Sequence, residues 1–177
     1  KDTPPSSIFA LFKELEKDQP KERFTLGITD DVTGLSLPEV KPAPITAAAG
    51  TKECKFWGLG GDGTVGANKN SVKIIGDHTD KYVQAYFQYD SKKTGGVTIS
   101  HLRFGDKPIR SPYYINQADF VACHNPAYIH MGMKMVQDVK PGGVFMINCQ
   151  WTDEELGQHL NAEAKKYIAD NNIQLYT

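Results

Sequence analysis

The sequence lacks the features by which many proteins bind nucleic acids or cross membranes. Its 20 lysine and arginine residues balance 21 aspartate and glutamate residues, so no overall field draws the chain to a polyanion or an anionic bilayer. No apolar run approaches the ~20 residues that a membrane helix requires. The polar residues 1–5 are unlike the apolar core of a secretion signal. We therefore expect a cytoplasmic protein without a nucleic-acid or membrane partner.

Cysteine is scarce, and the three cysteines lie far apart. Cys54, Cys123 and Cys149 form no CxxC pair, so the sequence predicts neither a zinc site nor an iron–sulfur site in this chain. Without a secretion signal, such cysteines are typically reduced. We expect all three thiols to be reduced, mostly buried and free of metal.

A recognisable catalytic group is also missing. The chain contains no G-x-S-x-G motif, and we interpret His101, on an alternating strand, and His124, just before a proline, as structural histidines. Three methionines near His130 fit helical packing better than a metal-binding or redox role. No catalytic and no metal-binding residue is therefore predicted in this chain.

A proline-rich segment at 37–44 divides the chain into two parts. Before it, apolar spacing predicts a helix over 6–17, with Ser7 as a cap, and a short strand over 23–28. After it, strands alternate with helices, and Thr152 with Glu155 forms a capping box. This alternation predicts an α/β fold of Rossmann-like type, with a mainly parallel sheet flanked by helices. The expected strands are 54–59, 82–89, 96–104, 118–123, 144–148 and 173–176.

A glycine-rich motif follows the first of these strands. Gly58, Gly60 and Gly63 match GxGxxG, with Gly61 inside the motif and Gly66 just after it. A strand before the motif, a helix after it and a further strand are the setting of a dinucleotide fold. There, glycines let the backbone approach a phosphate, and N–H groups at the helix start bind it. The alternative is a tight turn that binds no ligand.

Charged residues follow the second strand of the expected α/β domain. Asp90 is placed to hold a ribose diol, but Ser91, Lys92 and Lys93 come directly after it. Two lysines and a hydroxyl favour a ribose that carries a phosphate. NADP, with its 2′-phosphate, and coenzyme A, with its 3′-phosphate, both meet this description. A solvated lysine pair on a turn is the alternative.

Long stretches of the chain resemble one enzyme family. The runs FWGLGGDGTVGANKNS (56–71), YDSKKTGGVTISHLRFG (89–105) and ACHNPAY (122–128) are similar to the third domain of pyruvate:ferredoxin (flavodoxin) oxidoreductases, and FTLGITDDVT (24–33) resembles the segment that enters it. The resemblance implies an enzyme that converts pyruvate and coenzyme A to acetyl-CoA and CO₂ while reducing ferredoxin or flavodoxin. It also implies thiamine diphosphate, Mg²⁺ and [4Fe–4S] clusters in the rest of the enzyme.

The resemblance implies a place for this chain within the larger enzyme. Residues 1–45 would end the preceding domain and form a linker, and 46–177 would be the third, gamma-like domain without its C-terminal end. This domain would bind and orient coenzyme A through Asp62, Phe87, Ser91, Lys92 and Lys93. The partners would be the other domains of the enzyme, ferredoxin or flavodoxin, and a second copy in a homodimer. The chain alone would be inactive.

Two other functions remain open at this point. One is an NADP-binding reductase domain, which needs a catalytic residue that the sequence does not reveal. The other is a non-catalytic scaffold whose glycine loop packs only against neighbouring domains. Titration with each coenzyme separates these readings.

Overall fold

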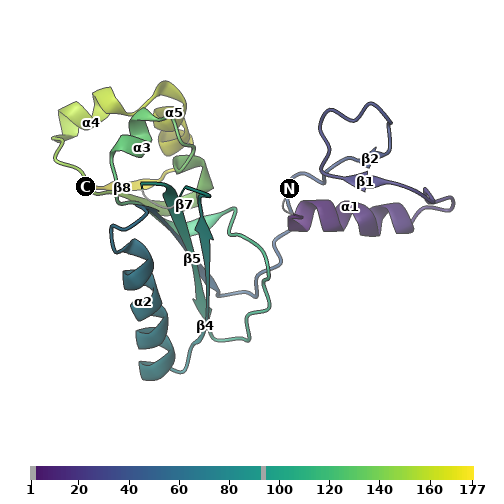
Figure 1. The fold of residues 1–177 in the computed structure, drawn as a ribbon, viewed down its shortest axis with the longest axis horizontal. Helices are drawn as coiled ribbons and strands as arrows, with labels where there is room; N and C mark the ends of the chain where they lie inside the picture. The colour runs from purple at the N-terminus through teal and green to yellow at the C-terminus, as the bar shows by residue number, and fades with distance from the viewer. Residues whose placement is uncertain (1–2, 93–94) are drawn as a thin grey trace. The chain divides into compact units, whose positions relative to one another are not determined.

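The computed structural model describes residues 3–92 and 95–177 (Figure 1). Within them, no helix is both long and apolar enough to cross a membrane. The elements in chain order are α1 (Pro5–Leu15), β1 (Thr25–Leu26), β2 (Ser36–Leu37), β3 (Lys52–Leu59), α2 (Thr64–His78), β4 (Tyr82–Tyr89), β5 (Val97–Gly105), β6 (Ala118–Cys123), α3 (Ala127–His130), the 3₁₀ turn η1 (Val136–Asp138), β7 (Val139–Ile147), α4 (Asp153–His159), α5 (Ala162–Asp170) and β8 (Gln174–Tyr176).

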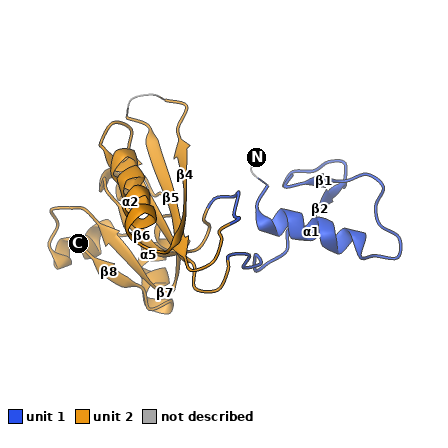
Figure 2. Cartoon of the chain, turned by 90° about the horizontal axis from the view of Figure 1, so that it is seen from below, with its two compact units in different colours: residues 1–47, 110–114 blue, residues 48–109, 115–177 orange. Residues whose placement is uncertain are grey.

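The chain forms two compact units (Figure 2). Unit 1 comprises residues 1–47 and 110–114, and its segments are joined by a hydrogen bond between Thr46 and Tyr113. It contains α1 and the short parallel pair β1–β2. The predicted Ser7 cap is wrong: α1 begins after Pro4, and the Ser7 hydroxyl lies within the helix, 3.3 Å from a Glu39 carboxylate oxygen.

Unit 2 comprises residues 48–109 and 115–177 and contains a six-stranded sheet in the order β4-β5-β3-β6-β7-β8. β3, β6, β7 and β8 pair in parallel, whereas β5 is antiparallel to both of its neighbours. Every strand except β5 therefore runs in the same direction. The predicted α/β fold with a mainly parallel sheet is confirmed, but β5 separates β3 from β4.

The length of one connection explains the position of β5. Only residues 90–96 join β4 to β5, and a parallel crossover needs a dozen or more residues. A connection this short, ending in Gly95 and Gly96, can only form a hairpin, so β5 returns beside β4. The strand–helix–strand unit β3-α2-β4 is thus split by an inserted antiparallel strand.

The helices of unit 2 cover opposite faces of the sheet (Figure 1). α2 packs over β3, β4 and β5, where Lys69 of α2 lies over the ring of Phe87. On the other face, α4 and α5 contribute to the main hydrophobic core together with β6 and β7. Members of this core include Val121, Phe145, Ile147, Leu156, Leu160 and Ala164.

Local signals in the C-terminal half were predicted with mixed success. The capping box is confirmed, since Thr152 Oγ1 accepts from the Glu155 N–H and the Glu155 carboxylate accepts from the Thr152 N–H. After Pro126 the chain forms only the single turn α3. The strand expected over 144–148 begins earlier, at Val139, and residues 141–143 lie inside β7, where the pairing with β6 shifts register. This irregularity has the form of a β-bulge.

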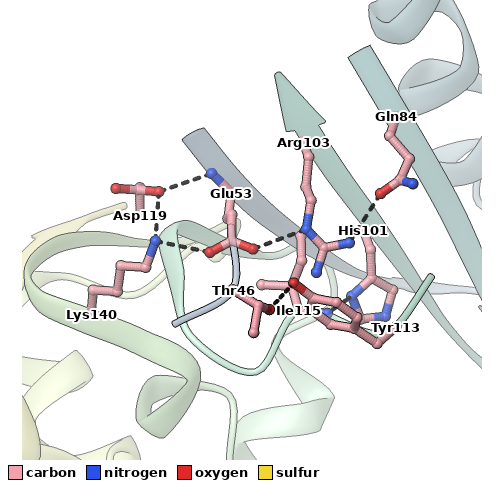
Figure 3. A network of polar contacts seen from close by, with 9 residues as sticks. All are labelled: Thr46, Glu53, Gln84, His101, Arg103, Tyr113, Ile115, Asp119 and Lys140. Atoms are coloured by element: carbon pink, nitrogen blue, oxygen red, sulfur yellow. Dashed lines mark hydrogen bonds and ion pairs between the residues drawn. The ribbon is translucent and has the colours of Figure 1, made fainter. Parts of the chain in front are cut away.

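A network of charged side chains lies beside the start of β3 (Figure 3). Arg103 donates to Glu53 Oε1 at 2.9 Å and to Gln84 Oε1 at 3.2 Å. Lys140 donates to Glu53 Oε2 at 2.9 Å and to Asp119 Oδ2 at 3.1 Å. Asp119 in turn accepts from the Glu53 backbone N–H. Glu53 and Arg103 are buried, so each ionic group is compensated by protein partners, as burial requires.

Candidate ligand-binding site

The candidate site lies at the carboxyl ends of the parallel strands of unit 2. From β3 the chain crosses toward β4, whereas from β6 it proceeds through β7 to β8 on the other side. The order of strands therefore reverses between the adjacent strands β3 and β6. In open α/β sheets, ligands bind in the crevice at this reversal, outside the carboxyl ends of the strands.

The loop after β3 is organised around its own carboxylate. Asp62 accepts hydrogen bonds from the Leu59 N–H at 2.8 Å, the Thr64 N–H at 2.7 Å and the Thr64 hydroxyl at 2.9 Å. Burial alone would raise the pKa of Asp62, but these hydrogen bonds hold that pKa below its ordinary value. The protein thus supplies its own negative charge at the start of α2. In other glycine loops, a bound phosphate occupies this position.

The glycines of the motif have different roles. Gly61 and Gly63 have φ values of 94° and 91°, which other residues rarely adopt. Gly58 is required by space, because a Cβ there would lie 2.4 Å from Thr64 Oγ1. Gly66 lies inside α2, and nothing is within 4 Å of a Cβ added to it. The motif therefore builds the turn with Gly58, Gly61 and Gly63, while Gly66 belongs to the helix.

His124 connects the loop after β3 to the end of β6. Its Nδ1 lies 2.8 Å from Thr64 Oγ1. The ionised Asp62 carboxylate can only accept, so the single Thr64 hydroxyl proton points to Asp62, and His124 Nδ1 must donate to Thr64. The proton of a neutral His124 is therefore fixed on Nδ1. The structural interpretation of His124 agrees with this contact, although the side chain also lines a cavity.

That cavity, here called the edge cavity, has a volume of about 510 Å³ and lies over the ends of the parallel strands. Its polar lining is formed by Asp62, Thr64, His124, Asn148 and Thr177. Each of these residues follows one of the parallel strands β3, β6, β7 and β8. The edge cavity is thus formed where the strand order reverses.

A second cavity, here called the hairpin cavity, lies on the other side of the glycine loop and has a volume of about 400 Å³. The Gly60 N–H donates to the Gly96 carbonyl at 2.7 Å, which joins the glycine loop to the β4–β5 hairpin. Asp90 and Lys92 lie on that hairpin and line the same cavity as Gly60. Its full lining is Gly60, Gly61, Val65, Tyr89, Asp90, Lys92, Gly96, Val97 and Thr98.

The remaining predicted ligand residues are distributed around these cavities. Ser91 is exposed, with its hydroxyl 3.3 Å from Asp90 Oδ1. Phe87 is half-buried under Lys69 and is not among the residues that line either cavity. Lys93 lies outside the described residues. The structure thus brings Gly60, Gly61 and Lys92 to one cavity and places Asp62 at the other.

The thiols and His101 show no sign of a reactive centre. All three cysteines are free, but only Cys123 is buried as predicted, while Cys54 and Cys149 are half-buried. Burial raises the pKa of both Cys54 and Cys123 to about 11, which makes them poor nucleophiles. His101 is buried and accepts from the Ile115 N–H at 3.1 Å. In the part of the chain that the structure describes, no three His, Cys, Asp or Glu side chains could hold a metal ion.

Sequence reasoning missed several cavity residues. Thr64 and Asn148 follow strand ends, and Tyr89 and Thr98 flank the hairpin turn. A search for polar residues directly after each parallel strand would have found Thr64 and Asn148. Thr98 could have been found from the period of two along β5, once β5 was recognised as a hairpin partner of β4.

Comparison with known proteins identifies the class. The family model for pyruvate ferredoxin/flavodoxin oxidoreductase matches residues 53–177. The chain is 53% identical over 177 residues to a pyruvate-flavodoxin oxidoreductase of Klebsiella pneumoniae, which covers 100% of this chain and 15% of that protein. It is 56% identical over 172 residues to a pyruvate:ferredoxin oxidoreductase of Moorella thermoacetica, covering 97% of this chain and 14% of that protein.

The chain therefore belongs to the pyruvate ferredoxin/flavodoxin oxidoreductase family, as the resemblance predicted. A crystal structure of pyruvate oxidoreductase subunit PORC from Thermotoga maritima has the same fold, with a TM-score of 0.51 and 20% identity over 63% of this chain and 57% of that one. The chain spans about 15% of the length of the Klebsiella relative.

Proposed function

We propose that this chain is the third domain of an enzyme that oxidatively decarboxylates pyruvate. The coenzyme A thiol takes up the acetyl group, CO₂ leaves, and the electron pair released passes to ferredoxin or flavodoxin. Thiamine diphosphate with Mg²⁺ and [4Fe–4S] clusters, which we assign to parts of the enzyme outside this chain, supply the carbon and electron-transfer chemistry when bound. Family membership and high identity to relatives of this name support the proposal.

We further propose that residues 46–177 bind and orient coenzyme A, and that residues 1–45 are the end of a preceding domain. The observation that carries this role is the hairpin cavity, where the glycine loop and the hairpin carrying Asp90 and Lys92 meet. The Lys92 ammonium is exposed beside this cavity and free to turn toward a phosphate. A coenzyme held here has its thiol tethered, which raises the local concentration of that thiol at the acetyl group.

Two places could bind a phosphate: the N–H groups of the glycine loop and the Lys92 side chain. The position of Asp62 favours Lys92. The Asp62 carboxylate already occupies the N–H groups of Leu59 and Thr64, so the loop itself repels a phosphate. Lys92 is exposed, and Asp90 Oδ1 lies 3.4 Å from its backbone N–H. The ribose phosphate of the coenzyme is therefore assigned to the Lys92 side.

Calorimetric titration of the full-length enzyme tests this assignment. Wild-type enzyme should bind coenzyme A more tightly than its 3′-dephospho form. Lys92→Ala should reduce that preference about tenfold, since one charge-assisted hydrogen bond at an exposed position is lost. Lys73→Ala, which removes an exposed charge from α2 at a residue outside both cavity linings, is the matched control.

Other outcomes would refute the assignment in different ways. Tight binding of NADP with weak binding of coenzyme A would favour a reductase domain. Binding of neither coenzyme would favour the scaffold role. Full retention of the 3′-phosphate preference in Lys92→Ala would show that Lys92 lies only on a solvated turn.

A further inference from the structure

Two hydroxyl groups on β5 are buried without a partner. Thr98 is 6% exposed and Ser100 is 1% exposed. Among the described residues, neither Thr98 Oγ1 nor Ser100 Oγ has a hydrogen-bond partner. Buried hydroxyls in folded proteins are normally hydrogen-bonded, because leaving one unpaired forfeits its hydration. Each of the two therefore calls for an explanation.

The two hydroxyls differ in what surrounds them. They are two residues apart on the same strand and so project from the same face of the sheet. Thr98 lines the hairpin cavity, together with Val65 of α2 and Lys92 of the hairpin. Ser100 is not among the residues that line the hairpin cavity and instead lies opposite Phe56 and Phe87 in the neighbouring strands. Only Thr98 therefore adjoins a cavity, and rotation about its Cα–Cβ bond is the movement that would bring the covered Oγ1 to a bound molecule.

We infer that the Thr98 hydroxyl is a ligand contact, and that it hydrogen-bonds the nucleoside part of a molecule whose ribose phosphate lies at Lys92. This inference rests on the proposed coenzyme A site and adds a residue to it. The hairpin cavity has an apolar side chain, Val65, and an aromatic neighbour, Tyr89. Such a lining suits a flat heterocycle with few polar atoms, each of which needs one well-placed partner.

The hydroxyl chemistry fits a nucleoside. A threonine hydroxyl both donates and accepts, and adenosine offers ring nitrogens, an amino group and ribose hydroxyls. Because Thr98 Oγ1 loses no protein partner on binding, the new hydrogen bond comes without breaking an old one. The contact should therefore contribute to affinity while contributing nothing to the stability of the unliganded protein.

The test uses Thr98→Val, which keeps the shape of the side chain and removes the hydroxyl, in the full-length enzyme. Adenosine 3′,5′-bisphosphate and coenzyme A are the probes, titrated calorimetrically. Thr98→Val should weaken binding of both about tenfold, the effect of one hydrogen bond, while thermal stability stays equal or rises. Thr98→Ser, which keeps the hydroxyl, should retain affinity to within about twofold.

Ser100→Ala is the matched control. It removes the other unpartnered buried hydroxyl from the same face of β5 and should leave both dissociation constants unchanged. Equal weakening by Ser100→Ala and Thr98→Val would overturn the inference, because repacking under α2 would then explain both. Wild-type affinity in Thr98→Val would also overturn it.

The coenzyme proposal and this inference fail differently. If Lys92→Ala loses the 3′-phosphate preference but Thr98→Val binds normally, the site stands and the Thr98 contact is wrong. If wild-type enzyme binds neither probe, the coenzyme site itself is wrong. If Thr98→Val does not fold, Thr98→Ser and Thr98→Ala take its place. Wild-type affinity in Thr98→Ser together with weaker binding in Thr98→Ala supports the contact. Equal affinity of the two variants refutes it.

Discussion

The two ends of β3 differ in the side chains that surround them. Near its start, Glu53 is buried and fully engaged by Arg103 and Lys140 (Figure 3). At its other end, β3 includes Gly58 and leads into a glycine turn whose residues line two cavities. The first end uses long charged side chains that compensate one another. The second removes side chains and leaves space. The difference separates a region whose side chains hold the sheet together from one that leaves two cavities open.

The opposite chemistry of these ends makes distinct demands on substitution. At the start of β3, removing one charge leaves its partners buried and uncompensated. At the end, adding even one carbon meets the turn. Stability measurements at the first end and combined stability and binding measurements at the second therefore test whether the division is real.

The largest effect is expected for Glu53→Ala. The variant leaves Arg103, which is 2% exposed, and Lys140 without their shared carboxylate, and the free energy of unfolding should fall by about 3–5 kcal/mol. Denaturant titration of the full-length enzyme measures the change. Asp170→Ala, which removes the exposed partner of Lys166, should cost at most about 0.5 kcal/mol. Similar losses in both variants would contradict the comparison.

A smaller loss is expected for Gly58→Ala. The added Cβ would lie 2.4 Å from Thr64 Oγ1 and 2.9 Å from Asp62 Oδ2. Thr64 cannot swing away without breaking its contacts to Asp62 and His124, so unfolding should become easier by about 1–3 kcal/mol.

Gly66→Ala provides the contrast for that substitution. Nothing lies within 4 Å of a Cβ at Gly66, which is inside α2, and alanine should raise the free energy of unfolding by up to about 1 kcal/mol. If Gly58→Ala proved as stable as wild type, the turn would not be as closely packed as the structure has it.

A third effect, similar in size to that of Gly58→Ala, is a dependence of stability on pH. Burial, followed by the nearby charges of Lys55 and Arg103, lowers the pKa of His101 to about 3 from an ordinary 6.5. Below pH 6.5, His101 becomes protonated in the unfolded chain but remains neutral in the folded protein. The His101 contribution is therefore complete above pH 6.5 and is lost progressively toward pH 3. Between pH 7 and pH 5 the loss should be about 2 kcal/mol.

Comparison with His101→Gln isolates this contribution from other titrating groups. Subtracting the pH profile of the variant should remove a decline of about 2 kcal/mol between pH 7 and pH 5. Identical profiles for wild type and His101→Gln would show that His101 is protonated in the folded protein after all.

The sequence was informative where the signals were local. The capping box at Thr152 and the mainly parallel sheet were both predicted, because capping and strand periodicity depend on neighbouring residues. The placement of β5 was not predicted, although residues 90–96 form a connection too short for a parallel crossover.

The sequence indicated where the candidate site lies but not its details. Gly60, Gly61 and Lys92 line one cavity, as a shared ligand would require. The role of Asp62 as an internal anion depends on where its carboxylate turns, which a motif does not encode. The sequence did not indicate Thr98 for the same reason. Whether its hydroxyl has a hydrogen-bond partner depends on the folded structure and cannot be seen from the sequence.

The inserted strand β5 also sets a length. Since β5 lies between β3 and β4, the ends of these two strands are separated by two strand spacings, about 10 Å. The hydrogen bond from Gly60 to Gly96 fixes the glycine loop to this frame. A molecule that touches both the glycine loop and the end of β4 must therefore span roughly that distance, which a free phosphate ion cannot do and a nucleotide can. The spacing of the strands thus sets a minimum length for any molecule that contacts both places.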